Sequence, residues 1–139
     1  MRAALFARRH SLPIVLQSER TECGLACLAM VAGYFGYHTN LTALRQQFPV
    51  SARGASLNDI LNVAGVLRLH TRALRLALEE FPKLQLPAIL HWDMMHFVVL
   101  KRVDSKGVVI HDPAIGEKRC LWAEVGQHFT GVAVECMPA

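Results

Sequence analysis

The chain has 139 residues, of which 53% are hydrophobic and 19% are charged, and this composition excludes an intrinsically disordered protein. The length fits one domain that buries a core of its own, and no apolar run approaches the length of a membrane-spanning helix. The net charge of +4 is spread without a basic cluster, so nucleic-acid binding is a poor explanation of the chain.

The N-terminal part of the chain predicts a loose segment followed by a helix. We expect residues 1–11 to be loosely structured and residues 12–139 to form the domain. Apolar residues recur at helical spacing from Thr21 to Phe35, which predicts a helix over this range. Gly36 is expected to end this helix, because glycine is favoured just after a helix terminus.

Two further helices are expected in the first half of the chain, and each begins at a capping residue. Asn40 predicts the cap of a short helix over Leu41–Phe48, and Ser56 predicts the cap of a helix over Leu57–Leu67. Side-chain oxygens of these residue types accept hydrogen bonds from the first free N–H groups of a helix. The first half is therefore expected to be helical.

The second half of the chain predicts strands. Short apolar, alternating or β-branched runs predict six of them: His70–Leu76, Pro87–His91, His96–Val103, Val108–His111, Lys118–Leu121 and Gly131–Cys136. A Lys106-Gly107 turn joins the third and fourth runs into a hairpin, and only Leu78–Phe81 and Leu121–Phe129 are expected to be helical there. Helices first and an antiparallel sheet afterwards predict an α+β fold.

Cys23 is the first candidate for chemistry, because it lies at the expected start of the first helix and is followed by Gly24. The thiolate is the reactive form of cysteine, and the positive end of a helix dipole favours it. Gln17 precedes Cys23 on the loop that enters the helix, so its amide and the Cys23 N–H could stabilise an oxyanion. Taken alone, an inert buried cysteine and a surface glutamine explain these residues as well.

His96 opens a predicted strand, and Asp112 ends the strand that pairs with it. The outer ends of a hairpin lie side by side, so the carboxylate can orient the imidazole, which can act as a general base for Cys23. A core histidine and an Asp-Pro turn are the simpler explanations of the two residues in isolation. Other histidines compete for the role, with His91 and His111 as the strongest rivals of a set that also holds His10, His38, His70 and His128.

The other three cysteines, Cys27, Cys120 and Cys136, are expected to pack in the core of a reduced protein. We expect no cofactor and no metal ion. A zinc site is one alternative, because Cys23 and Cys27 lie one helical turn apart and could share the ion with His91, His96 or His111. A module that binds a secreted peptide without cutting it is a second alternative.

Gln17, Cys23, His96 and Asp112 occur in the chain order of papain-like cysteine peptidases. Four longer stretches resemble one family of this kind: LPIVLQSERTECGLACLAMVAGYFG, SARGASLNDI, LPAILHWDMMHFVVL and VVIHDPAIGEKR. They are similar to the double-glycine leader peptidase domains at the N-terminus of bacterial peptidase-containing ABC transporters, most of all those of the colicin V-type microcin exporters. The resemblance covers nearly the whole chain.

The resemblance implies a papain-like fold with Cys23 as nucleophile, His96 as base, Asp112 as orienting carboxylate and Gln17 in the oxyanion hole. Glu22 stands where many members of the family have aspartate. The implied activity is cleavage of a bacteriocin, microcin or signalling precursor after a Gly-Gly or Gly-Ala motif, coupled to export. The implied partners are that precursor and the transmembrane and ATP-binding domains of an exporter, at the cytoplasmic face of the bacterial inner membrane.

In this family the leader forms an amphipathic helix, whose apolar face would lie in a groove of the peptidase. Three large apolar residues stand just before His96, on what we expect to be a loop: Trp92, Met94 and Met95. Methionine side chains suit adaptable peptide contacts, so these residues are candidates for binding the substrate. Trp92 is explained equally well as a core residue.

Overall fold

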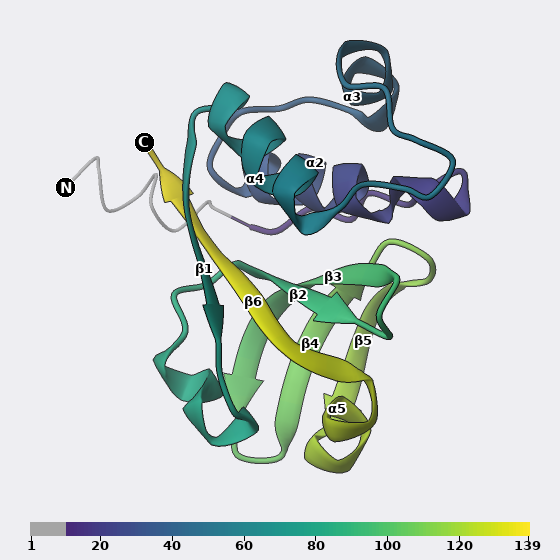
Figure 1. Cartoon of the computed structure of the whole chain (residues 1–139). Helices are drawn as coiled ribbons and strands as arrows, with labels where there is room; N and C mark the ends of the chain where they lie inside the picture. The colour runs from purple at the N-terminus through teal and green to yellow at the C-terminus, as the bar shows by residue number, and fades with distance from the viewer. Residues whose placement is uncertain (1–10) are drawn as a thin grey trace, which may run out of the picture.

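The computed structural model describes residues 11–139, so residues 1–10 of the expected loose segment lie outside the described part of the chain. The described residues form a group of helices from the first half and a sheet from the second half (Figure 1). In Figure 1, helices α2, α3 and α4 lie together on one side of the sheet, and α5 lies at the opposite end of the strands. The predicted α+β fold is confirmed.

The helical layer starts with the short turn η1 (Arg20–Glu22), which leads directly into α2 (Cys23–Tyr34). The residues of α2 from Cys23 to Ala32 are all buried, because this helix packs against α3, α4 and β3. A helix that is apolar all round belongs in a core. No helix of residues 11–139 has the length and apolar character that crossing a membrane requires.

The other two helices of this layer are α3 (Leu41–Gln47) and α4 (Leu57–Val66). Their predicted caps are confirmed, because the side-chain oxygens of Asn40 and Ser56 each accept a hydrogen bond from a backbone N–H of the helix they precede. The predicted boundaries of the two helices hold to within a residue at each end, because local capping chemistry defines where they start.

Six strands of the described chain form one antiparallel sheet in the order β1-β6-β2-β3-β4-β5. The last strand of the sequence therefore inserts between the first two. The elements of this layer are β1 (Leu69–Arg75), η2 (Leu78–Lys83), β2 (Ala88–Trp92), β3 (His96–Asp104), β4 (Gly107–Asp112), β5 (Gly116–Leu121), α5 (Trp122–His128) and β6 (Phe129–Pro138). All six predicted strands are confirmed.

The centre of the sheet is buried on both faces. Successive side chains of a strand point to opposite faces, so neighbouring residues of one strand join different clusters. In β3, Phe97 and Val99 join the core cluster beneath the helical layer, whereas Val98 and Leu100 join a second cluster that includes residues of η2 and α5. Cys23 belongs to the first cluster. The packing of α2 on β3 thus brings the start of the helix to the sheet.

Candidate active site

Cys23 is the first residue of α2 and is only 5% exposed. No side chain caps this helix, and Cys23 lies at the positive end of its dipole. The Cys23 Sγ lies 4.0 Å from the backbone oxygen of Met95, the residue that precedes β3. The sulfur therefore lies at the junction of the helical layer and the sheet.

His96 and Asp112 meet where the start of β3 and the end of β4 lie side by side, as the hairpin geometry predicts. The His96 Nε2 lies 2.7 Å from the Asp112 Oδ1, and their side chains are 20% and 13% exposed. The Asp112 Oδ1 also accepts a hydrogen bond from the Ala114 N–H at 2.9 Å. Because Nε2 faces the carboxylate, the Nδ1 of His96 is the nitrogen left to exchange a proton with a nucleophile.

Burial lowers the pKa of His96, but hydrogen bonds with Asp112 and with Cys23 outweigh it and raise the pKa to about 9. For Asp112, burial has the opposite effect and raises the pKa, but the hydrogen bonds from His96 and Ala114 outweigh it and bring the pKa below its usual value. At neutral pH the imidazole is therefore protonated and the carboxyl is ionised. An imidazolium between a carboxylate and a cysteine is the arrangement that activates a thiolate nucleophile.

The two strongest rival histidines have other partners. His111 is 1% exposed, with Nδ1 at 3.0 Å from the Pro13 oxygen and Nε2 at 2.8 Å from the Glu117 Oε1. His91 lies 2.8 Å from the Thr130 Oγ1 and 2.6 Å from the Met94 oxygen through its two ring nitrogens. Both nitrogens of each of these rings are occupied, whereas His96 interacts with the Cys23 side chain.

Gln17 lies in the extended segment before η1, and its backbone N–H donates to the Pro113 oxygen at 2.9 Å. Its Oε1 is buried and has no hydrogen-bond partner among the described residues. Buried polar atoms are usually paired, and rotation of the amide can exchange its oxygen and nitrogen. Gln17 thus has an unpaired amide oxygen on a segment whose backbone contacts the Asp112-Pro113 turn.

A groove of about 510 Å³ is lined by Met95, whose backbone oxygen lies 4.0 Å from the Cys23 Sγ, although Cys23, His96 and Asp112 do not themselves line it. Its lining comes from both layers: Arg53, Gly54, Ala55, Ser56, Leu57, His91, Met94, Met95, Phe97 and Val132. Met94 and Met95 are each 72% exposed, so the two methionines that the sequence singled out lie at the groove with their side chains accessible.

Trp92 does not line this groove. It is the last residue of β2 rather than a loop residue, is 4% exposed, and stacks on the His128 ring with centroids 5.4 Å apart. The prediction that Trp92 lies on a loop was wrong, because β2 extends one residue further than expected. Its side chain falls on the same face as Ala88 and Leu90 and belongs to the second core cluster.

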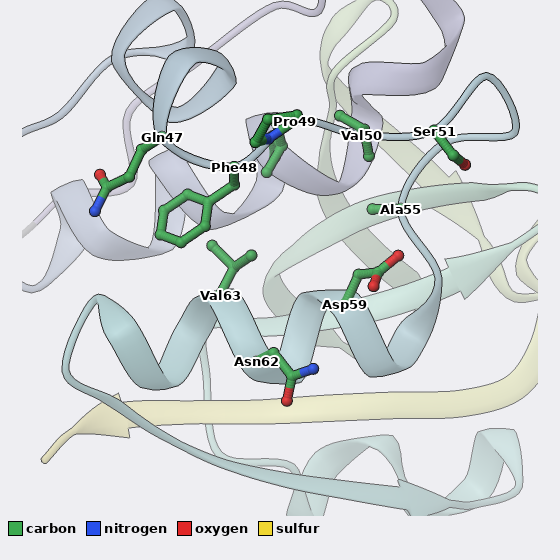
Figure 2. Close-up of a pocket in the computed structure, with 10 residues that line it drawn as sticks. Gln47, Phe48, Pro49, Val50, Ser51, Ala55, Asp59, Asn62 and Val63 are labelled. Carbon is green, nitrogen blue, oxygen red and sulfur yellow. The ribbon is translucent and has the colours of Figure 1, made fainter.

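A second pocket of about 440 Å³ lies within the helical layer, between the segment that follows α3 and helix α4. Figure 2 shows Phe48 above Val63, with Asp59 and Asn62 on α4 below. None of the three residues Cys23, His96 and Asp112 lines this pocket. The groove is assigned to the candidate site because it is lined by Met95, whose backbone oxygen approaches the Cys23 sulfur.

The remaining cysteines are free thiols in the two core clusters. Burial raises the pKa of Cys27 well above its usual value, and burial with the Glu135 charge raises the pKa of Cys136 to about 12. These thiols are therefore not nucleophiles near neutral pH. Within residues 11–139, no group of three or more histidine, cysteine, aspartate or glutamate side chains is placed to hold a metal ion.

Two features of the site had no role in the sequence analysis. The loop that holds Gly54 and Ala55 lies against η1 and the start of α2, since an added Cβ at Gly54 would lie 3.3 Å from the Thr21 oxygen and one at Gly24 would lie 3.1 Å from the Ala55 Cβ. Glu22 is buried and pairs with Arg45 of α3. A glycine beside an alanine is a weak signal, and nothing in the sequence relates an acid before Cys23 to an arginine in another helix.

Sequence comparisons find relatives that match nearly the whole described chain. The model of the family described as Peptidase C39 matches residues 11–139. A probable microcin-H47 secretion/processing ATP-binding protein of Escherichia coli is 48% identical over 130 residues, which cover 94% of this chain and 19% of the relative. A colicin V secretion/processing ATP-binding protein of Escherichia coli is 49% identical over 127 residues, which cover 91% of this chain and 18% of the relative. The chain thus spans under a fifth of the length of these relatives.

Solved structures show the same architecture. The crystal structure of a double glycine motif protease from an AMS/PCAT transporter, in complex with the leader peptide, superposes with a TM-score of 0.87. It is 34% identical, and the match covers 94% of each chain. The peptidase domain of Streptococcus ComA has a TM-score of 0.86 at 24% identity, over 93% of this chain and 100% of that domain, which shows a shared fold.

Proposed function

This chain belongs to the Peptidase C39 family, and we propose that it removes the leader of a precursor peptide by cutting after a Gly-Gly or Gly-Ala motif. The single observation that carries this proposal is the contact of His96 with Asp112 at 2.7 Å beside the buried thiol of Cys23. In this proposal Cys23 is the nucleophile, His96 the proton carrier and Asp112 the residue that orients it.

The first chemical step follows from this geometry. The Cys23 thiolate attacks the carbonyl carbon of the second glycine, and the carbonyl oxygen takes the negative charge. The Gln17 amide and the Cys23 N–H at the start of α2 donate hydrogen bonds to that oxyanion. His96 then gives its Nδ1 proton to the leaving amine, the C–N bond breaks, and a thioester to Cys23 is left.

The second step returns the enzyme to its starting state. Water enters after the cargo amine has left, and His96 takes a proton from the water as it attacks the thioester. The C–S bond breaks, the leader departs with a new carboxylate, and the thiolate with its imidazolium partner is restored. Throughout both steps the Asp112 carboxylate keeps the Nε2–H of His96 fixed and stabilises its positive charge.

Selectivity for small residues is attributed to the loop that crowds the start of α2. A Cβ added at Gly24 would lie 3.1 Å from the Ala55 Cβ and 3.2 Å from the Ile60 Cδ1. The Met95 oxygen approaches Cys23 from the opposite layer. We attribute the exclusion of branched side chains next to the cleaved bond to this close packing around the first residues of α2.

The leader upstream of the cut is assigned to the groove of about 510 Å³. Apolar side chains of the helical layer and the sheet meet there, namely Leu57, Met94, Phe97 and Val132, with Arg53 at the same groove. An amphipathic helix binds such a groove through one apolar face. The accessible methionines provide adaptable contacts for leaders of different sequence.

The proposed setting is a bacterial peptide exporter. The two Escherichia coli relatives are described as secretion/processing ATP-binding proteins, and this chain matches a small part of each. We assign the chain a place beside transmembrane and ATP-binding domains, at the cytoplasmic face of the inner membrane, where precursors are available. The cargo would be a bacteriocin, a microcin or a signalling peptide.

The test is cleavage of a synthetic peptide that carries an amphipathic leader, a Gly-Gly motif and a short cargo, under reducing conditions with product masses determined. Cleavage after the second glycine is expected, together with its loss on treatment with iodoacetamide. A peptide with Val-Val in place of Gly-Gly is the matched control and should remain intact. Binding of the Gly-Gly peptide without any cleavage would reject the peptidase and favour a binding module.

A further inference from the structure

Glu22 is a buried acid next to the proposed nucleophile, and the mechanism above does not use it. Its residue exposure is 2%, and its Oε1 accepts hydrogen bonds from the Ser18 N–H at 2.9 Å and from the Glu19 N–H at 3.0 Å. Burying a carboxylate is costly unless it is paired and hydrogen-bonded. The Glu22 carboxylate is nevertheless buried, between Gln17 and Cys23 in the chain. Its position beside two candidate site residues suggests a role in the site.

Arg45 of α3 is the charged partner of this carboxylate. Its Nε donates to the Glu22 Oε2, and the side-chain exposures are 40% for Arg45 and 3% for Glu22. The hydrogen bond from Arg45 is the largest influence on the carboxyl and, with those from Ser18 and Glu19, lowers the pKa of Glu22 despite burial. Glu22 therefore stays ionised and joins α3, the start of α2 and the preceding loop.

The loop that holds Gln17 is fixed at both ends by this arrangement. The Gln17 N–H donates to the Pro113 oxygen of the sheet layer, and the next two N–H groups donate to Glu22. Three consecutive backbone donors are thus held by the two layers that also hold Asp112 and Cys23. The Gln17 Oε1 has no hydrogen-bond partner among the described residues, and the hydrogen bonds that hold Gln17 are those of its backbone and of the two residues after it.

We propose that Glu22, held by Arg45, is a positioning residue that fixes the Gln17 loop relative to the Cys23 N–H and so assembles the oxyanion hole. This inference rests on the proposed peptidase activity. Glu22 makes no contact with the reacting atoms in this role, and no proton passes through it. A donor displaced from an oxyanion loses most of its benefit, because such stabilisation depends on preorganised geometry.

The test variants are Glu22→Ala and Glu22→Gln in the complete chain. Glu22→Ala frees the Ser18 and Glu19 N–H groups and leaves Arg45 unpaired, so kcat is expected to fall about tenfold or more while KM stays within about twofold. Glu22→Gln keeps an oxygen that can accept both N–H groups, so its loss of kcat should be smaller. Wild-type cleavage is measured first, and its absence would reject the proposed function rather than this inference.

Glu135→Ala is a closely matched control. Glu135 is also a buried acid, 6% exposed, that accepts one hydrogen bond from an arginine Nε and one from a backbone N–H. It lies on β6, outside the candidate site. A comparable loss of stability with unchanged kcat per folded molecule is expected. An equal fall of kcat in Glu135→Ala and Glu22→Ala would overturn the inference, because the effect would then be general destabilisation.

Alkylation separates positioning of the oxyanion hole from activation of the thiol. Iodoacetamide reacts with the thiolate without forming an oxyanion, so the rate of Cys23 alkylation in Glu22→Ala should stay within about twofold of wild type while hydrolysis falls. In the Gln17→Ala background, Glu22→Ala should lower kcat little further, because both changes remove the same interaction. Alkylation that falls in proportion to hydrolysis, or full additivity with Gln17→Ala, would show that Glu22 does not act through Gln17.

Discussion

The helical layer and the sheet contribute to the candidate site in different ways. The sheet supplies His96 and Asp112, which come from one hairpin and are joined by a hydrogen bond of 2.7 Å. The helical layer supplies Cys23, whose sulfur approaches the Met95 oxygen at 4.0 Å. The base and its carboxylate are thus held within one layer, whereas the nucleophile is brought to them by the packing of α2 on β3.

This difference shows where the site is robust and where it is sensitive. The His96–Asp112 pair needs only the β3–β4 hairpin, but its approach to Cys23 needs the whole core cluster between the layers. Catalysis depends on placement to a fraction of an ångström. Changes within the sheet should therefore affect proton transfer, whereas changes at the junction should affect every step.

The largest effect is expected when the contribution of the helical layer is removed. Cys23→Ala should abolish cleavage of a Gly-Gly leader peptide, at least about 10³-fold below wild type, because no other accessible thiol stands at the site. Circular dichroism and product masses measure fold and turnover. Cys27→Ala, one helical turn further into the same core, is the control and should lose stability but keep activity. Full activity of Cys23→Ala would show that Cys23 is not the nucleophile.

A nearly equal loss is expected when the base is removed from the sheet. His96→Ala should lower kcat by about 10³-fold, because both thiolate formation and protonation of the leaving amine fail. His111→Ala is the matched control, since His111 is more deeply buried and holds Pro13 and Glu117. It should cost about 1–3 kcal/mol in urea unfolding and leave kcat per folded molecule unchanged. Loss of activity in His111→Ala together with normal activity in His96→Ala would show that His111 is the base.

Helix positions and the order of site residues could be predicted from the sequence, because both depend on local signals. Asn40 and Ser56 mark helix starts by their own hydrogen bonds, and each cap is where the sequence predicts it. The pairing of His96 with Asp112 follows from one short hairpin, so it too was predictable. The burial of Trp92 could also have been predicted. It lies two residues after Leu90 on β2, so its side chain points to the same buried face.

The remaining features depend on contacts far apart in the sequence. The insertion of β6 between β1 and β2 joins strands that are far apart in the sequence and leaves no mark in any one segment. The pair of Glu22 with Arg45 likewise links two helices, and an exposed acid would look the same in the sequence. Tertiary packing decides both, which is why Glu22 was not assigned a role beforehand.

A smaller loss of activity is expected when the carboxylate that orients the base within the sheet is removed. Asp112→Ala should lower kcat by about 10²-fold rather than abolish it, because packing still places the His96 ring. Its pH profile should also change. Burial, which lowers the pKa of His96, would remain, while the contribution of Asp112 that helps raise it to about 9 would be lost. The basic limb of kcat/KM should therefore move to lower pH.

The direction of this shift follows from which form of His96 is active. The imidazolium donates the proton to the leaving amine, so activity falls as pH rises through the folded-state pKa of about 9. The raised pKa of His96 also stabilises the fold. This stabilisation is fully present below pH 6.5, the ordinary histidine pKa, and is lost as pH rises through about 9. Rate and urea-unfolding profiles of Asp112→Ala that match wild type on the basic side would contradict the assigned pair.

The smallest effect is expected in the groove, where the two layers contribute alike. Leu57→Ala from α4 and Met94→Ala from the sheet side should each raise KM about three- to tenfold with kcat unchanged, because each removes apolar contact with the leader but leaves the reacting atoms in place. Val66→Ala, an exposed residue of the same helix α4 outside this groove, should leave both constants unchanged. An effect from Leu57 alone would place the leader on the helical layer, and a fall in kcat would mean that the groove shapes the catalytic junction itself.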